Sequence, residues 1–168
     1  MRKILVCLAT TILLFLSGHT STLAVEPDLR IEQMRAVLTK YNSPMLGLEE
    51  ILIATAEKYK LDWTLMAAIA GTESSFGKRM PVSPTGGPCI NPYGWGIYGD
   101  HKLCFSTFEA AIEGVASGLA KKYNISSLES IARTYNIVST EGWISHTRFF
   151  MHKIQAAEIP VHALPITL

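Results

Sequence analysis

The segment Leu65–Gly71 is the feature that most limits how this chain can fold. Its residues, Leu-Met-Ala-Ala-Ile-Ala-Gly, would be apolar on every side of a helix. A helix without a polar face has to be surrounded by other elements. The sequence therefore predicts a buried helix over about residues 63–75, with Asp62 as its N-cap and Gly77 as its stop.

Five further stretches carry apolar residues at helical spacing and predict the helices that surround the buried one. Three of them are 30–41, 48–60 and 141–156. The other two begin at capping boxes: one runs from Ser106-x-x-Glu109 to Tyr123, and one runs from Ser126-x-x-Glu129 to about Tyr135. Residues 78–105 contain five of the twelve glycines and four of the eight prolines. They predict a long loop and then a short hairpin, with strands 94–98 and 102–105 and a turn at 99–101. The expected fold class is mainly α (α+β), with one small β-hairpin after the buried helix.

The amino-terminal residues are typical of a targeting segment. Ile4–Gly18 is an almost wholly apolar run behind Arg2 and Lys3. It is short for a bilayer-spanning helix, which needs about 20 apolar residues. A positive start, a short apolar stretch and then small residues predict a secretory signal peptide, with cleavage after Ala24. The alternative is an uncleaved membrane anchor.

Cleavage changes what the composition implies. Removing residues 1–24 from the 168-residue chain leaves 144 residues, enough for one domain that buries about two thirds of its unfolded surface. The net charge falls from +1 to −1, because 13 basic and 14 acidic residues remain. This balance argues against a nucleic-acid partner, since phosphate binding needs a basic face. We expect a secreted or periplasmic monomer with no membrane contact after cleavage.

The cysteines predict one disulfide and no metal site. Cys7 leaves with the signal peptide, so Cys89 and Cys104 remain. Two cysteines in an exported chain indicate a disulfide. The sequence contains no Cys-x-x-Cys motif, and its histidines have no ligand spacing. We therefore expect neither a metal nor another cofactor.

Glu73 is the first candidate for chemistry. It follows Ala70, Ile69 and Met66 by three, four and seven residues, so it lies on their stripe of the buried helix. Apolar surroundings and the negative end of the helix dipole both raise the pKa of a carboxyl group there. A carboxylic acid held protonated near neutral pH is what a glycosidase uses to protonate a leaving oxygen. The alternative is a helix-end acid turned to solvent.

The segment Asn91–Tyr98 is the second candidate. It contains three aromatic residues, two glycines and an asparagine. Aromatic faces stack on sugar rings, glycines let backbone approach a ligand, and an amide both donates and accepts hydrogen bonds. The alternative is a glycine-kinked hairpin whose aromatic rings cover the core.

These motifs resemble the lysozyme-like enzymes that cleave peptidoglycan. Ala68–Lys78 with Asn91–Gly96 is similar to the bacterial glucosaminidase family, named for mannosyl-glycoprotein endo-β-N-acetylglucosaminidase-like domains. That family has a Glu-Ser-x-x-Gly box and then an Asn-x-x-Gly element that enters a β-hairpin. Residues 131–136 and 143–151 resemble its carboxy-terminal Tyr and Trp…Phe-Met pattern. Soluble lytic transglycosylases share a Glu-Ser-x-Phe box.

The resemblance implies a fold, an activity and a set of site residues. Together with the signal peptide 1–24, it divides the chain into an N-terminal helix and linker 25–47, a lysozyme-like glucosaminidase domain 48–157 and an extended tail 158–168. It implies an exported glycoside hydrolase that cleaves β-1,4 bonds of peptidoglycan strands. Glu73 would be the general acid and Tyr135 would lie beside it. The substrate would contact Ser74, Asn91, Tyr93, Gly94 and Trp95.

The second catalytic carboxylate is open at this point. Asp100 in the hairpin is the first candidate, and Glu109 in the capping box is the second. If neither serves, one Glu is enough for a lytic transglycosylase, in which a sugar hydroxyl attacks within the substrate. An alternative of another class is a lysozyme-like domain that binds wall glycan without cutting it. A weaker one is a structural helical module.

Overall fold

The computed structural model describes residues 28–83 and 85–159, so the predicted signal peptide and nearly all of the tail lie outside it. The described part is mainly helical, with one small antiparallel sheet, which confirms the predicted fold class. Its helices are α1 (Leu29–Lys40), α2 (Glu49–Lys58), α3 (Leu65–Ser74), α4 (Phe108–Lys122), α5 (Leu128–Tyr135) and α6 (Thr140–Gln155). Its strands are β1 (Ile97–Tyr98) and β2 (His101–Lys102).

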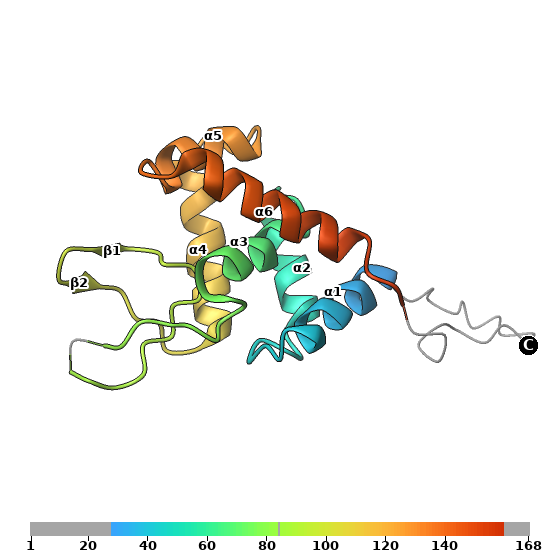
Figure 1. The fold of residues 1–168 in the computed structure, drawn as a ribbon, viewed down its shortest axis with the longest axis horizontal. Helices are drawn as coiled ribbons and strands as arrows, with labels where there is room; N and C mark the ends of the chain where they lie inside the picture. The colour runs from blue at the N-terminus through green and yellow to red at the C-terminus, as the bar shows by residue number, and fades with distance from the viewer. Residues whose placement is uncertain (1–27, 84, 160–168) are drawn as a thin grey trace, which may run out of the picture.

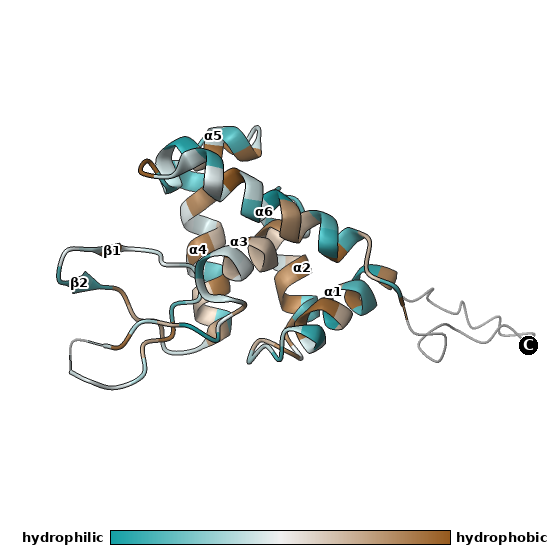
Figure 2. Ribbon diagram, in the orientation of Figure 1, coloured by the Kyte–Doolittle hydropathy of each residue, from teal (hydrophilic) through white to brown (hydrophobic). Residues whose placement is uncertain are grey.

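Helix α3 lies in the middle of the helical body, as its apolar sequence requires. Every residue from Leu65 to Gly71 is buried. Helix α6 crosses α3 closely: a Cβ on Gly71 would lie 2.9 Å from the ring of Phe150. In Figure 2, α1 and α5 carry teal hydrophilic turns, whereas α3 is mostly white to brown. Met34 and Leu38 of α1 belong to the same buried core as α3.

Both ends of α3 differ from the prediction. Asp62 is not the N-cap, because it belongs to a turn before the helix, where its Oδ1 accepts a hydrogen bond of 2.8 Å from the backbone N–H of Thr64. The carboxy-terminal end comes at Ser74, before the expected stop at Gly77. Ser75 and Phe76 already have positive φ angles of 53° and 59°. The chain therefore leaves the helix immediately after Glu73 and Ser74.

The predicted capping boxes are wrong by one residue. Thr107, not Ser106, is the N-cap of α4; its extended backbone lets its side chain accept a 3.1 Å hydrogen bond from the N–H of Ala110. Helix α5 likewise begins after Ser127 rather than Ser126. Two adjacent Ser or Thr residues are equally good caps by type, so backbone geometry decides between them.

The hairpin is shorter than predicted. Ile97 pairs with Lys102 and Tyr98 with His101, which leaves Gly99 and Asp100 as a two-residue turn. His101 therefore belongs to a strand and not to the turn. Figure 1 shows the hairpin projecting away from the helices, with its turn at the far end.

Candidate active site

Glu73 lies in the last turn of α3, with its two carboxylate oxygens in different surroundings. Its Oε1 accepts a hydrogen bond of 2.7 Å from the indole Nε1–H of Trp143 in α6. Its Oε2 faces the backbone of Gly94, where a Cβ would lie only 3.1 Å from it. Gly94 has a φ of +62°. A glycine here both permits that backbone conformation and leaves room for the carboxylate.

The surroundings of Glu73 raise its pKa. Desolvation by the surrounding protein is the main cause, and the hydrogen bond from Trp143 partly opposes it. The side chain is nevertheless exposed to water. The two observations fit a carboxyl group that is crowded by protein on most sides and open on one. Such a group holds its proton to a higher pH than an ordinary glutamate and remains within reach of a substrate.

Ser74 connects the end of α3 to the loop that carries Gly94. Its hydroxyl lies 2.7 Å from the carbonyl of Pro92 and 3.0 Å from that of Ala70, and it accepts a 2.8 Å bond from the N–H of Gly77. The residue is buried. Ser74, expected to contact substrate, therefore lies beneath the candidate site and holds the loop against the helix.

Replacing Ser74 with Ala is expected to destabilise the fold by about 1–3 kcal/mol, because the buried N–H and carbonyl groups that the hydroxyl joins lose their partner. Urea unfolding of wild type and variant measures the difference. Ser75→Ala is the control at the neighbouring position, since Ser75 is only half-buried. Equal unfolding midpoints for Ser74→Ala and wild type would contradict this role.

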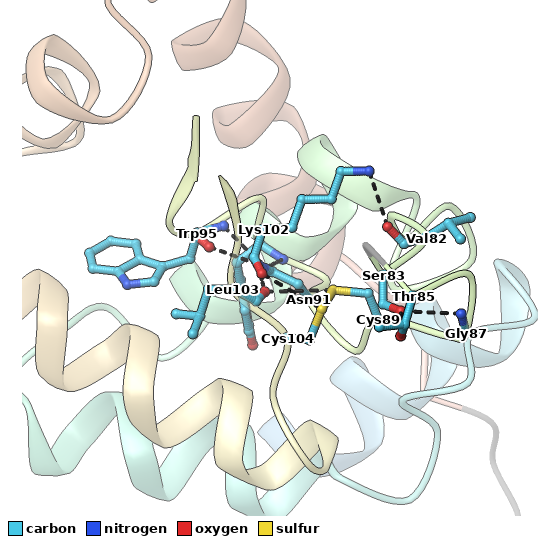
Figure 3. The surroundings of a disulfide bond; sticks show 11 residues. Val82, Ser83, Thr85, Gly87, Cys89, Asn91, Trp95, Lys102, Leu103 and Cys104 are labelled. Carbon is cyan, nitrogen blue, oxygen red and sulfur yellow. Dashed lines mark hydrogen bonds between the residues drawn. A yellow bond between two sulfur atoms is a disulfide. The ribbon is translucent and has the colours of Figure 1, made fainter. Parts of the chain in front are cut away.

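Asn91 organises the loop from inside. Its Nδ2 donates to the carbonyls of Trp95 and Leu103, at 2.7 and 2.8 Å, and its Oδ1 accepts from the N–H of Trp95 at 3.1 Å. Figure 3 shows Asn91 beside the disulfide of Cys89 and Cys104, with the Trp95 ring pointing away from it. The disulfide is as predicted. Asn91 is buried and its amide is fully used, so it shapes the loop instead of lining a groove.

Tyr93 and Tyr135 connect this loop to α5. The hydroxyl of Tyr135 donates a 2.6 Å hydrogen bond to the backbone carbonyl of Tyr93. Tyr93, which was expected to contact substrate, is completely buried, and its own hydroxyl has no partner among the described residues. Burial raises the pKa of Tyr135 well above its ordinary value, and the nearby charge of Glu73 adds to this. Tyr135 therefore lies near Glu73 and stays neutral.

Aromatic rings from four parts of the chain gather near Glu73. The rings of Tyr135 and Trp143 stack with centroids 5.0 Å apart, and Trp95 lies 5.8 Å from Tyr135 and 5.5 Å from Tyr123. Trp95 packs on α4 at Gly118, where a Cβ would lie 2.4 Å from the indole. These rings form a continuous aromatic wall from α6 to the loop before β1.

A groove of about 400 Å³ runs along this wall. Glu73 does not line the groove, but Gly94 and Tyr135, which do line it, are its direct neighbours. The residues that matter for the site are Gly94, Trp95, Tyr98, Tyr123, Thr134 and Tyr135. The geometry thus joins one carboxyl group of raised pKa to an aromatic groove.

A larger hollow of about 650 Å³ lies between α1 and α6. Among the described residues it is lined by apolar side chains, by Lys40, His152 and Lys153, and by one carboxylate, that of the exposed Glu158. We therefore take the smaller groove beside Glu73 as the candidate site, because it combines the carboxyl group with stacked rings.

Neither of the two candidates for a second carboxylate lines the groove. Asp100 is exposed in the hairpin turn. Glu109 is exposed in the first turn of α4, where hydrogen bonds from its own backbone N–H and from Thr107 lower its pKa. Among the described residues, no other carboxylate contributes to the raised pKa of Glu73.

Trp143 is the site residue that sequence reasoning missed. It stood in the predicted last helix as part of a Trp…Phe-Met pattern, with no role assigned to its indole. Its separation of 70 residues from Glu73 leaves no local periodicity that could pair them. The signal that could have found it is the combination of that pattern with the Glu-Ser box.

Two other kinds of site, a metal centre and a membrane-spanning helix, find no support in the described residues. Within residues 28–83 and 85–159, no three His, Cys, Asp or Glu side chains gather as a metal ion would require. No helix in the same part is long and apolar enough to cross a bilayer. Neither the comparison with protein-family models nor that with curated proteins finds a match to this chain.

Proposed function

We propose that this chain is an exported glycosidase that cleaves β-1,4 bonds of peptidoglycan strands, of the endo-β-N-acetylglucosaminidase type, with Glu73 as the general acid. The observation that carries the proposal is the position of Glu73. Its carboxyl group has a raised pKa, is open to solvent on one side and adjoins a groove walled by Trp95 and Tyr135. An uncharged sugar chain fits such a groove, because sugar rings stack on aromatic faces.

In this mechanism the O–H bond of Glu73 breaks as its proton moves to the glycosidic oxygen. The bond between that oxygen and C1 of the sugar breaks at the same time, and an oxocarbenium-like transition state forms. Water then adds its hydroxyl to C1 and returns a proton to Glu73. The neutral Tyr135 holds the carbonyl of Tyr93, which keeps the loop with Gly94 beside the acid.

A single-carboxylate reaction is the second candidate, and a specific observation favours it. Among the described residues that line the groove there is no carboxylate, and Asp100 lies in an exposed turn. In a lytic transglycosylase a hydroxyl of the same sugar takes the place of water and attacks C1. The product then carries an anhydro ring and lacks one water relative to the hydrolytic product.

Mass spectrometry of digested peptidoglycan separates these chemistries. The mature protein is incubated with purified glycan strands, and the new chain ends are identified. A hydrolytic GlcNAc end supports the glucosaminidase reaction, a hydrolytic MurNAc end supports a different bond preference, and an anhydro end supports the transglycosylase. Retention of glycan with no new ends would contradict all three and favour a binding domain.

A further inference from the structure

Trp143 contacts one of the two oxygens of Glu73 and leaves the other free. We propose that Trp143 is a positioning residue, which reserves Oε1 as a hydrogen-bond acceptor and so makes Oε2 the oxygen that carries and delivers the proton. This inference rests on the proposed role of Glu73 as a general acid. It adds which carboxylate oxygen of Glu73 donates the proton and which residue determines that choice.

The chemistry of the indole makes the selection. An indole N–H can donate a hydrogen bond but cannot accept one. With Nε1 of Trp143 at 2.7 Å, a proton on Oε1 would face another donor, whereas Oε2 lies beside the backbone of Gly94, which offers it no such donor at the Cα. Trp143 itself is buried.

One series of contacts links the groups that lie beside the two carboxylate oxygens of Glu73. Trp143 stacks on Tyr135 with an angle of 29° between the rings. Tyr135 donates to the carbonyl of Tyr93, and Tyr93 precedes Gly94, which faces Oε2. The indole that holds Oε1 is therefore linked through Tyr135 to the backbone that borders Oε2. A shift of Trp143 would change the angle at which the proton is presented.

The groups that face Glu73 make its titration easy to interpret. From α6 the indole of Trp143 faces it, from α5 the neutral Tyr135, and from the loop the backbone of Gly94. A donor to the charged form of a carboxyl group stabilises that form. Removing the indole N–H therefore raises the pKa of Glu73 further.

The first test uses the wild-type mature protein and needs no variant. The indole ¹H–¹⁵N resonance of Trp143 is followed by NMR across a pH titration. We expect it to shift with one inflection at a pH above the ordinary glutamate range, and we expect Glu73→Gln to remove that inflection. A Trp143 resonance that does not respond to pH would overturn the inference.

The second test removes the donor. Trp143→Phe keeps an aromatic ring to stack on Tyr135 but has no N–H. We expect kcat on peptidoglycan to fall about ten- to a hundredfold with little change in KM, because the acid is misoriented. We also expect the alkaline limb of the pH–rate profile to move to higher pH. Trp63→Phe is the control, since Trp63 precedes α3 at the end opposite to Glu73 and contacts Arg30.

The third test crowds the other oxygen. A Cβ introduced by Gly94→Ala meets Oε2, whereas Gly99→Ala introduces the same Cβ at a similar positive φ with no atom within 4 Å. We expect a loss of kcat for Gly94→Ala only, with the Trp143 resonance still titrating. Unchanged kcat in both Trp143→Phe and Gly94→Ala would overturn the inference but leave the proposed function intact. A wild type that forms no new glycan ends would overturn both.

Discussion

Replacing Glu73 with Gln is expected to lower the rate of glycan cleavage about 100- to 10,000-fold, which is the usual contribution of a general acid. Gln keeps the size of the side chain, and its carbonyl oxygen can still accept the hydrogen bond from Trp143. It has no proton that it can transfer to a leaving oxygen. The rate at which new glycan ends form, compared between variant and wild type, measures the effect.

Two further variants show whether the loss of activity is specific to Glu73. Glu50→Gln removes an exposed carboxylate of α2 and should leave the rate unchanged. Asp100→Asn tests the hairpin candidate for a second carboxylate. A loss as large as that of Glu73→Gln would identify Asp100 as a catalytic partner that reaches the substrate when bound. A rate for Glu73→Gln within twofold of wild type would contradict the assignment of Glu73.

The same variant has an expected effect on stability. The pKa of Glu73 is raised in the folded protein, mainly by desolvation, so the fold favours the protonated form. Its contribution is fully present below the pKa of an unfolded glutamate and is lost as the pH rises through the folded pKa. Gln imitates the protonated form at every pH. The Tm of Glu73→Gln should therefore equal that of wild type in acid and exceed it at neutral pH.

Removing the disulfide has the second large expected effect. The Cys89–Cys104 bond closes a loop with a sequence separation of 15, and it should stabilise the fold by about 3 kcal/mol. The double variant Cys89→Ser, Cys104→Ser is expected to lose this amount. Activity should fall as well, because Asn91 bonds the carbonyl of Leu103 next to the bridge and shapes the Trp95 loop.

Denaturant unfolding with and without reductant measures this effect. Reductant should lower the unfolding midpoint of wild type to that of the double variant and leave the double variant unchanged. Equal midpoints for wild type and double variant under oxidising conditions would contradict the stabilising role.

The sequence was enough to predict the helical class and the position of Glu73. Both follow from local patterns: the wholly apolar segment Leu65–Gly71 could only be a buried helix, and Glu73 lies at its end. Helix ends were predicted less well. At α4 the choice between Ser106 and Thr107 depends on backbone angles, which residue type alone does not determine.

The inner structure of the site could not be predicted from local patterns. Ser74, Asn91 and Tyr93 have side chains that suit a sugar groove, yet all three are buried beneath it. The polar groups of Ser74 and Asn91 were needed to satisfy the backbone of an irregular loop, and this demand appears only when the loop is packed. The bond from Trp143 to Glu73 joins residues that only the crossing of α3 and α6 brings together.

The number of new glycan ends formed per molecule of mature protein tests the central claim most directly. It is measured on purified peptidoglycan for wild type and Glu73→Gln side by side, together with the amount of each protein retained on the glycan. The proposed function predicts many ends per molecule of wild type and almost none for Glu73→Gln, with both proteins retained. Retention of wild type without new ends, or equal numbers of ends for the two proteins, would contradict it.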